Sequence, residues 1–577
     1  MTQSLEPLFN PQSVAIIGAS DDPNRIGGRP VSSTKDGGYK GRIYPVNPKR
    51  ETVQGLPAYS SIRDVPEAVD CAIIAVPAHL ALNALTDCAD KGTKSAVIFS
   101  SGFAELGEDG AAMQDRIVSV AREAGVRLIG PNCLGVFNLG TGWCGTFSNV
   151  RAGTLLAPGG TAIVSQSGAY GSHMFYMAQR RGVATDLWVT TGNESDIDVA
   201  EVICFYARSP DVHTIMAYVE GMKDRDRICE ALELARAAEK PVIMTKVGET
   251  DVGAAAAATH TASLAGADAI YDALFQQYGV YRAHSCQEIV EAAYACQTGL
   301  FPKGRKIAIQ TVSGGIGIQM ADTAVKNGLE VPPMPEDLQE KLLQLIPYAG
   351  VRNPIDITGQ VLNQPEVIEQ SIDLAIQESG CDAFAIYLAS APQVPGLKEL
   401  CQEAFSNLRN KHPDIPMALS LIAQPDAIRS FEQKKISCFE DPAVSVRTTA
   451  ALAHFGEIFA RGKPDPAPAL PATVRPVPGE TVSEHEAKDI LASADIPVTR
   501  DILAKTRADA AEAFKSIGGA VVLKIASPDI QHKTEIGGVL VNLTDETSVL
   551  EGFDTLMTRA RTARPDARLD GVIVSEM

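Results

Sequence analysis

The sequence predicts a multidomain α/β protein, and three observations lead to this fold class. The chain has 577 residues, too many for a single hydrophobic core, which predicts about three to five domains. Short apolar runs of strand length alternate with longer amphipathic stretches, which is typical of parallel sheets covered by helices. A proline-rich stretch at 463–480 interrupts this alternation and predicts a semi-rigid, extended linker.

The composition limits the class of partner. Hydrophobic residues make up 45% of the chain and charged residues 21%, which is typical of a soluble globular protein. The net charge of −19 argues against generic nucleic-acid or anionic-membrane binding, because phosphate groups require clustered Lys and Arg. No apolar run reaches membrane-spanning length, and the N-terminus lacks the features of a signal peptide. The eleven scattered cysteines predict reduced thiols in a cytoplasmic protein and no metal site.

Residues 1–150 are predicted to form a first domain with a Rossmann-like sheet. Its strands are expected at 13–17, 41–46, 69–76, 95–99 and 126–129, with helices at 78–91 and 110–124. Ligands of such sheets bind at the carboxyl ends of the strands. Those ends carry residues that permit close backbone approach and offer N–H donors to phosphate: Gly18, Ala19, Ser20, Asn47, Lys49, Val76, Pro77, Ser101, Gly102, Pro131 and Asn132.

The Gly18 loop lacks the full glycine fingerprint of a dinucleotide site, and no acidic residue ends the second strand. A phosphate-bearing nucleotide other than a dinucleotide is therefore favoured. Any one of these loops is also explained as a plain strand–helix turn, an alternative that weakens when all of them are taken together.

Residues 151–298 and 299–462 are predicted to form two further flavodoxin-like α/β domains. In each, a strand leads into a glycine-containing helix start, which is an anion site because unpaired N–H groups and the helix dipole face the ligand. These starts are Ser165, Gln166, Ser167 and Gly168 in one domain, and Ser313, Gly314 and Gly315 in the other. The similarity of the two starts suggests an internal repeat.

An alanine-rich stretch at 254–266 contains His260. Neutral imidazole is a good nucleophile near neutral pH and can carry a phosphoryl group. A single histidine without a chemical role remains the commoner case. Another candidate is Glu220, which follows the strand expected at 214–219. The alternative interpretation is that Glu220 is a solvated carboxylate without a chemical role.

Residues 481–577 are predicted to form a fourth domain. Ser483 and Glu486 have the spacing of a capping box, which predicts a helix start. A helix at 507–516 and strands near Val498, at 520–525 and at 571–577 are expected. Because a domain rarely ends on a strand, we expect this domain to be truncated at Met577.

Taken in order, these segments resemble the ADP-forming acyl-CoA synthetases, single-chain relatives of succinyl-CoA synthetase. The resemblance covers essentially the whole chain and depends on six motifs that occur in family order: Gly18–Ser20, Gly130–Asn132, the two helix starts, Thr259–Gly266 and Ser527–Gly538. It implies that 1–150 bind CoA through the strand-end residues given above, that 151–298 and 299–462 are succinyl-CoA-synthetase-type domains, and that 481–577 are the first lobe of an ATP-grasp domain. One departure is Ala262, where the family usually has glycine.

The resemblance also implies roles for individual residues. His260 corresponds to the phosphorylated catalytic histidine and Glu220 to the glutamate that orients it, while the two helix starts bind the phosphoryl group. His532 matches a second phosphorylated histidine, with phosphate binding or a structural role as alternatives. The implied ATP-binding residues are Lys524, Lys533, Glu576 and Met577, and the Mg²⁺ ligands are expected beyond Met577.

The implied reaction joins a small carboxylate to CoA, with ATP converted to ADP and phosphate, in a homodimer. Two alternatives stay open: a non-catalytic protein that senses CoA or acyl-CoA, and a Rossmann dehydrogenase, which the incomplete fingerprint disfavours. The carboxylate is not defined by the sequence. We expect the loops at 192–198 and 353–359 to contribute to the acyl pocket.

Overall fold

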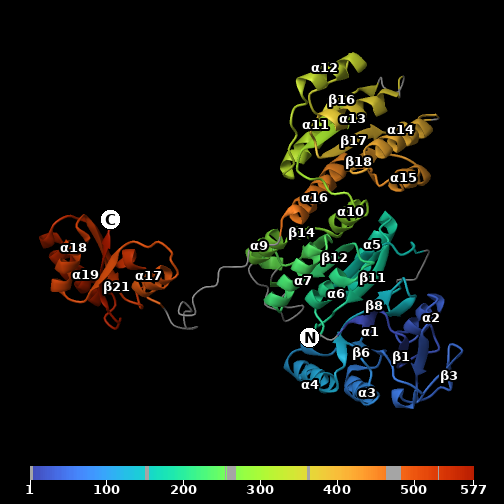
Figure 1. The fold of residues 1–577 in the computed structure, drawn as a ribbon. Helices are drawn as coiled ribbons and strands as arrows, with labels where there is room; N and C mark the ends of the chain where they lie inside the picture. The colour runs from blue at the N-terminus through green and yellow to red at the C-terminus, as the bar shows by residue number, and fades with distance from the viewer. Residues whose placement is uncertain are drawn as a thin grey trace. The chain divides into compact units, whose positions relative to one another are not determined.

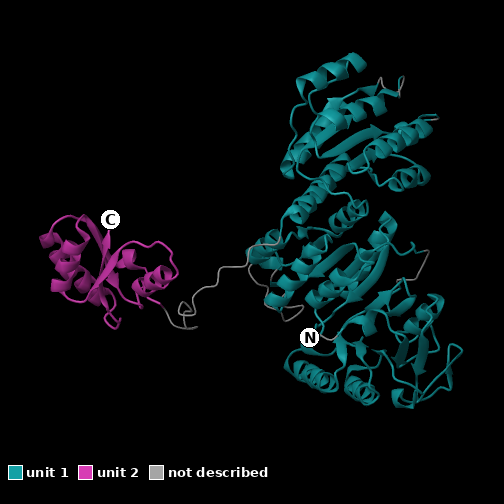
Figure 2. Cartoon of the chain, in the orientation of Figure 1, with its two compact units in different colours: residues 1–463 teal, residues 464–577 magenta. Residues whose placement is uncertain are grey.

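The computed structural model describes residues 4–149, 155–253, 255–256, 268–359, 364, 366–394, 396–462, 482–530 and 532–577. The chain divides into two compact units, which we call unit 1 (Met1–Lys463) and unit 2 (Pro464–Met577) (Figure 2). Unit 1 contains three large sheets with helices on their faces, and unit 2 contains one (Figure 1).

The first sheet has five parallel strands in the order β2-β1-β5-β6-β7. They are β1 (Ser13–Ile17), β2 (Arg42–Val46), β5 (Cys71–Ile74), β6 (Ser95–Ile98) and β7 (Arg127–Ile129), with helices α1 (Glu6–Phe9), α2 (Arg29–Asp36), α3 (Ala78–Asp90) and α4 (Glu108–Ala124) and the small hairpin β3 (Thr52–Val53) and β4 (Leu56–Pro57). Val14 and Ile16 belong to one hydrophobic cluster and Ala15 to another, so both faces of the sheet are buried. Two-sided burial explains why the central strands β1, β5 and β6 consist almost entirely of apolar residues.

The second sheet has seven strands in the order β14-β13-β12-β10-β11-β8-β9. Its parallel part consists of β10 (Thr161–Ser165), β11 (Thr185–Thr190), β12 (Thr214–Val219), β13 (Val242–Lys246) and β14 (Tyr281–Arg282), with helices α5 (Gly168–Arg181), α6 (Val199–Arg208), α7 (Arg225–Ala237), α9 (Asp268–Tyr278) and α10 (Cys286–Cys296). The hairpin β8 (Gly135–Asn138) and β9 (Trp143–Thr146) adds an antiparallel edge through β11. Residues 135–146 of the expected first domain therefore extend the second sheet.

The third sheet has five parallel strands in the order β16-β15-β17-β18-β19. They are β15 (Ile307–Thr311), β16 (Ile355–Asp356), β17 (Ala383–Ala389), β18 (Met417–Leu421) and β19 (Ser437–Phe439), with helices α11 (Gly314–Lys326), α12 (Glu336–Leu345), α13 (Glu366–Glu378), α14 (Leu397–Lys411), α15 (Pro425–Glu432) and α16 (Pro442–Ala460). Phe439 and Phe455 pack in one hydrophobic cluster with Trp188 of β11, which joins the second and third sheets.

Unit 2 is built around an antiparallel sheet in the order β20-β23-β21-β22. Its strands are β20 (Asp501–Ala504), β21 (Val521–Ala526), β22 (Val539–Leu543) and β23 (Gly571–Glu576), and its helices are α17 (Glu484–Ser493), α18 (Arg507–Ile517) and α19 (Glu546–Ala563). The predicted capping box is confirmed, because Ser483 and Glu486 bond reciprocally at the start of α17. The strand expected near Val498 begins at Asp501, and the sequence reasoning missed β22 and α19.

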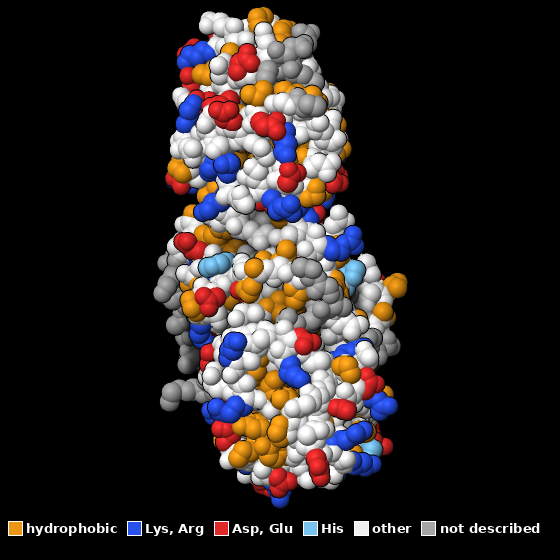
Figure 3. All heavy atoms as spheres, turned by 90° about the vertical axis from the view of Figure 1, so that its right-hand side faces the viewer, with side chains coloured by type: hydrophobic (Ala, Val, Ile, Leu, Met, Phe, Trp, Pro, Cys, Tyr) orange, Lys and Arg blue, Asp and Glu red, His pale blue; other side chains and the backbone are white. Residues whose placement is uncertain are grey.

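All eleven cysteines are free thiols, and most are buried. Among the residues that the structure describes, no helix is both long and apolar enough to cross a membrane. On the face drawn in Figure 3, acidic and basic side chains are interspersed, with small apolar patches between them.

Candidate functional site

A cleft of about 840 Å³ lies in unit 1 where the first and second sheets meet. Loops that follow β5, β6 and β7 contribute from the first sheet, and loops that follow β10, β11 and β12 contribute from the second. Its lining consists of Ile26, Ala75, Val76, Pro77, Ala78, Phe99, Ser100, Ser101, Asn132, Cys133, Leu134, Phe147, Gln166, Ser167, Gly168, Ala169, Gly192, Asn193 and Glu220.

The cleft brings together candidate residues from three separate predictions. Val76, Pro77, Ser101 and Asn132 come from the strand ends of the first sheet; Gln166, Ser167 and Gly168 come from the start of α5; and Glu220 comes from the end of β12. The other strand-end candidates and Ser165 lie outside the lining. The second helix start is also absent from it: Ser313, Gly314 and Gly315.

The Gly18 loop lies against the β5 end of the cleft. Gly18 has φ +84°, and a Cβ there would lie 2.5 Å from the carbonyl oxygen of Ala75, so the close approach requires glycine. Asn47 Nδ2 donates to the carbonyl oxygen of Ala19 at 2.8 Å, and Gln54 Nε2 donates to that of Ser20 at 2.9 Å. Asn47 thus holds the loop in shape, and sequence reasoning missed the same role for Gln54.

The loop at Ser101 and Gly102 is held by a carboxylate that sequence reasoning did not identify. Glu105 Oε1 accepts from the backbone N–H groups of Gly102 at 2.6 Å and Phe103 at 3.2 Å. Burial alone would raise the pKa of Glu105, but hydrogen bonds from Asn193 and from these N–H groups lower it overall. Glu105 therefore stays ionised and holds the loop at Ser101 and Gly102 beside the cleft.

The start of α5 uses its side chains to shape the turn. Ser167 caps the helix by accepting from the N–H of Tyr170 at 3.3 Å, and Ser165 donates to the carbonyl oxygen of Ser167 at 2.6 Å. A Cβ on Gly168 would lie 2.6 Å from Cγ of Leu134, so glycine permits this close packing. Other backbone N–H groups of the first turn remain available to an anion, as at any helix start.

Glu220 is the one charged side chain among the described residues that line the cleft. It is only 6% exposed, and Tyr218 donates to its Oε1 at 3.4 Å. The side chain of Gln166 holds the backbone at this point. Its Oε1 accepts from the N–H groups of Glu220 at 2.5 Å and Gly221 at 3.3 Å, and its Nε2 donates to the Gly221 carbonyl at 2.7 Å.

The prediction for His260 lies outside the described residues, but both flanks of its segment are described. Lys246, at the end of β13, is fully buried and lies 3.4 Å from Asp268 at the start of α9. Arg282 of β14 pairs with Asp268 at 2.9 Å and with Glu249 at 3.1 Å. Ion pairs therefore join the residues before the segment to those after it.

The loops expected to form the acyl pocket differ in their position. Gly192 and Asn193 line the cleft, whereas the loop at 353–359 belongs to the third sheet and is not part of the lining. There, a Cβ on Gly314 would lie 2.9 Å from Asp356 Oδ2, which places this carboxylate beside the start of α11.

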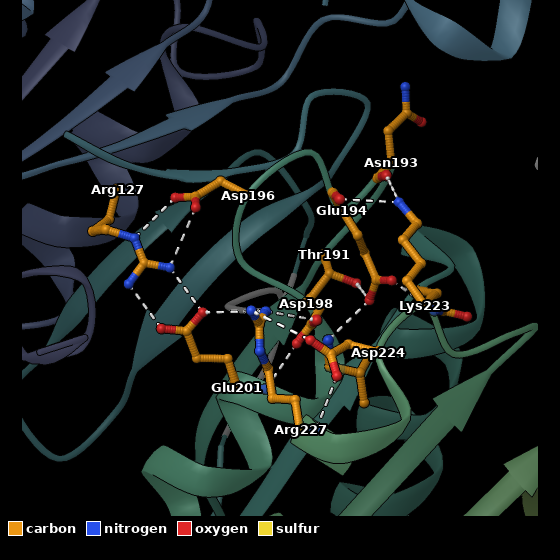
Figure 4. A network of polar contacts seen from close by, with 12 residues as sticks. Arg127, Thr191, Asn193, Glu194, Asp196, Asp198, Glu201, Lys223, Asp224 and Arg227 are labelled. Carbon is orange, nitrogen blue, oxygen red and sulfur yellow. Dashed lines mark hydrogen bonds and ion pairs between the residues drawn. The ribbon is translucent and has the colours of Figure 1, made fainter. Parts of the chain in front are cut away.

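A network of polar contacts joins the loop after β11 to the first sheet (Figure 4). Arg127 pairs with Asp196 at 2.9 Å and with Glu201 at 2.7 Å, and its side chain is only 15% exposed. Nearby, Arg227 pairs with Asp198 at 2.9 Å. Sequence reasoning missed this network, because its members are far apart along the chain.

In unit 2, the candidate ATP residues Lys524 and Lys533 lie on either side of Glu484, a residue that sequence reasoning did not identify. Glu484 Oε1 accepts from Lys524 Nζ at 2.7 Å, and its Oε2 accepts from Lys533 Nζ at 2.8 Å; we call these three residues the lysine cluster. Burial would raise the pKa of Glu484, but the two lysines outweigh it and lower it to about 2. His532 is exposed and directly precedes the short helix η6 (Lys533–Ile536).

The remaining candidates in unit 2 lie at the end of β23. Glu576 Oε1 accepts from the N–H of Arg500 at 3.0 Å, so this side chain is used in the backbone structure. Met577 is 69% exposed. Within the described ranges, no three His, Cys, Asp or Glu side chains are grouped as a metal site would require.

Four family models match the chain in succession. They are a CoA binding domain at residues 12–138, a succinyl-CoA ligase like flavodoxin domain at 158–296, a ligase-CoA domain at 307–441 and an ATP-grasp domain at 476–577. These matches, together with the sheets described above, confirm the predicted fold class.

Individual relatives match over almost the whole chain. Acetate–CoA ligase [ADP-forming] I of Archaeoglobus fulgidus is 32% identical over 99% of this chain and 82% of its own length. The 4-hydroxybutyrate–CoA ligase [ADP-forming] of Nitrosopumilus maritimus is 30% identical over 100% of this chain and 83% of its own. The structure of acetyl-coenzyme A synthetase 1 of Ca. Korarchaeum cryptofilum with phosphate and ADP matches with TM-score 0.72 and 30% identity, over 79% of this chain and 97% of that one.

Proposed function

The chain belongs to the family of ADP-forming acid–CoA ligases, and we propose that the cleft of unit 1 is the place where its acyl group is transferred to CoA. The protein is an acid–thiol ligase that forms an acyl-CoA from a carboxylate and CoA, with ATP converted to ADP and phosphate. The observation that carries the placement is that one cleft joins the strand ends of the first sheet, the start of α5 and the buried Glu220.

In this proposal, CoA lies along the strand ends of the first sheet, with its thiol directed into the cleft. Val76, Pro77, Ser101 and Asn132 contact it there, and the Gly18 loop approaches its phosphates through backbone N–H groups. Lys49 is exposed and able to pair with a further phosphate. Apolar side chains such as Phe99, Leu134 and Phe147 exclude water from the reacting carbonyl.

The transfer proceeds through phosphorylated His260. The carboxylate oxygen attacks phosphorus, the N–P bond breaks, and an acyl phosphate forms. The CoA thiol then attacks the acyl carbon, the C–O bond to phosphate breaks, and phosphate leaves with the thiol proton. Glu220 orients the imidazole, and the start of α5 stabilises the phosphoryl charge because its dipole and N–H groups are already fixed.

In unit 2, Lys524 and Lys533 hold the phosphates of ATP, with Glu576 and Met577 beside the adenine. His532 receives the terminal phosphoryl group from ATP and passes it to His260. Its exposed position before η6 supports this relay, because an exposed imidazole is accessible to both donor and acceptor. The described residues offer no ligand set for Mg²⁺, so no step is assigned to it.

The test is an assay of the full-length protein with ATP, CoA and a panel of carboxylic acids, following CoA consumption and ADP release. At least one acid is expected to give acyl-CoA, and His260→Ala is expected to give none. Acyl-CoA formation by His260→Ala with ATP would overturn the phosphohistidine mechanism. For the relay, His532→Ala is expected to lose ATP-driven labelling of His260 yet still convert acyl phosphate and CoA.

The same preparations distinguish the other candidates. A protein that only senses CoA would show no phosphoryl labelling by ATP, and a dehydrogenase would be protected from heat by NAD rather than by CoA. We also propose a cytoplasmic homodimer, to be checked by light scattering of the purified protein and by fractionation of cells.

A further inference from the structure

The side chains of Asn193 and Glu194, two consecutive residues after β11, point in opposite directions (Figure 4). Asn193 contacts the loops at the strand ends of the first sheet, and Glu194 contacts the start of α5. Both lie in the stretch that the Arg127 network fastens to the first sheet. The loop is therefore positioned between the residues proposed to bind CoA and those proposed to hold the phosphoryl group.

On the CoA side, Asn193 is bonded to the segments after β6 and β7 and to helix α4. Its Nδ2 donates to Glu105 Oε2 at 2.5 Å and to Gln114 Oε1 at 3.0 Å, and its Oδ1 accepts from Asn132 Nδ2 at 3.3 Å. Glu105 is the carboxylate that holds the N–H groups of Gly102 and Phe103. A shift of the loop at Gly102 would therefore move Asn193.

On the phosphoryl side, Glu194 is only 7% exposed, and three donors converge on its carboxylate. Oε1 accepts from the Thr191 hydroxyl at 3.0 Å and the Val199 N–H at 2.9 Å, and Oε2 accepts from Gln166 Nε2 at 2.9 Å. Gln166 in turn accepts from the N–H groups of Glu220 and Gly221. A continuous set of hydrogen bonds thus leads from Glu194 to the backbone of Glu220.

We infer that Asn193 and Glu194 couple CoA binding to the orientation of Glu220, with Glu194 acting as a positioning residue through Gln166. This inference rests on the proposed function of the cleft. When CoA contacts the loops at Ser101 and Asn132, Asn193 transmits the change to the loop. Glu194 then holds Gln166, and through it Glu220, in the orientation that serves acyl transfer.

Only the carboxylate form of Glu194 completes this connection. All three of its partners donate, so an added proton, or the NH₂ of a glutamine, would face the NH₂ of Gln166 and weaken that bond. Burial raises the pKa of Glu194 to about 7, while Lys223 opposes the rise. The other charged groups nearby are Asp198, which Arg227 neutralises, and Glu220, which shares Gln166.

The direct test measures backbone hydrogen exchange in the full-length protein with and without CoA. In the wild type, CoA is expected to slow exchange of the Glu220 and Gly221 amides about fivefold or more, because Gln166 becomes better ordered. In Glu194→Gln these amides exchange faster, and CoA has no effect on them. In Asn193→Ala, CoA still binds but leaves their exchange unchanged. Equal responses in all three proteins would overturn the coupling.

Kinetics give a second readout that a merely structural role would not move. Glu194→Gln is expected to lower kcat for acyl-CoA formation about 10- to 100-fold, the size expected for a lost hydrogen bond to a charged group, with KM for CoA nearly unchanged. Wild-type kcat is expected to fall as the pH drops through about 7, and this fall is absent in the variant. Asn193 and Glu194 act in sequence in this coupling. The variant that carries both Asn193→Ala and Glu194→Gln is therefore expected to lose less kcat than the product of the losses in the two single variants.

The matched control is Asp186→Asn, which removes a carboxylate from the other end of β11. Asp186 accepts from the N–H groups of Gly159 at 2.5 Å and Gly160 at 3.0 Å, away from the cleft lining. The control is expected to keep wild-type kcat and the response of the amides to CoA. An inactive wild type would refute the proposed function, whereas an active wild type with an unaffected Glu194→Gln would refute only this inference.

Discussion

The cleft of unit 1 is built mainly of backbone and neutral side chains, whereas the lysine cluster of unit 2 is built of charges. Glu220 is the one charged group among the described residues of the cleft lining, and its loops are held by Asn47 and Gln166 and, behind the lining, by Glu105. In unit 2, Glu484 lies between two lysine ammonium groups at hydrogen-bond distance. The two sites therefore differ in how they are kept in shape without a ligand.

This difference follows from what each site is proposed to bind. The cleft is proposed to receive a thiol, an acyl group and a single phosphoryl group, and fixed backbone N–H groups stabilise the phosphoryl charge without reorganisation. A triphosphate carries several negative charges before any reaction, so its site needs cations that must be neutralised when no nucleotide is present. Glu484 supplies that neutralisation within the chain.

The largest expected effect comes from Glu220, the charged residue of the described cleft lining. Glu220→Gln keeps the shape of the side chain but removes its charge, and is expected to lower kcat for acyl-CoA formation about 10²- to 10³-fold. Binding of CoA to unit 1, measured by calorimetry, should change less than about twofold, because CoA contacts lie elsewhere in the lining. An unchanged kcat would remove Glu220 from the proposed mechanism.

The charges of unit 1 outside the cleft are expected to act on stability. Arg127→Ala leaves Asp196 and Glu201 without their shared partner and is expected to lower the free energy of unfolding by about 3 kcal/mol. Trp143 and Trp188 are both buried in unit 1, so tryptophan fluorescence during urea unfolding reports on this unit. The matched control is Arg208→Ala, whose pair with Glu230 is exposed and contributes less than about 1 kcal/mol. Similar losses in the two variants would show that burial of the Arg127 network contributes nothing.

The lysine cluster is expected to make the stability of unit 2 depend on acid. The folded-state pKa of Glu484 is about 2, below its ordinary value of 4.5, so its stabilisation is present above about pH 4.5 and is lost as the pH falls toward 2. Glu484→Gln should therefore be less stable than the wild type by about 2 kcal/mol at pH 6, after allowing for partial exposure.

This difference is expected to shrink between pH 5 and pH 2. Hydrogen exchange of the amides of β21 measures it, and the control is Glu546→Gln, whose pair with Lys515 is exposed. If the difference in stability between wild type and Glu484→Gln did not change with pH, the charge of Glu484 would not contribute to the stability of this site.

The smallest expected effect compares the two helix starts. Ser167 caps α5 through its side chain, whereas Ser313 at α11 makes no such bond. Ser167→Ala is expected to lower the stability of unit 1 by about 1 kcal/mol, and Ser313→Ala by less than about 0.5 kcal/mol. Thermal unfolding of both variants decides this, and equal losses would mean that the cap at α5 has no energetic role.

Most strands of unit 1 could be predicted from the sequence, because strands buried on both faces are apolar throughout and bounded by glycine or polar residues. The helices α6 and α7 were missed. The hairpin at 135–146 was also missed, since its place in the second sheet depends on pairing with β11, about fifty residues later. Local patterns contain no information about such a partner.

The sequence by itself determined the order of domains, the family and a set of candidate residues, because glycine-containing strand ends and helix starts are local features. Only the tertiary structure decided which of these residues meet: it placed Val76, Ser101, Gln166 and Glu220 in one cleft and left Ser313 outside its lining. It also showed that the side chain of Gln166 bonds to the backbone of Glu220, and it assigned Glu105, Glu194 and Glu484 their partners. The physical reason is that hydrogen bonds and ion pairs act over a few ångströms in space, between side chains that are tens of residues apart along the chain.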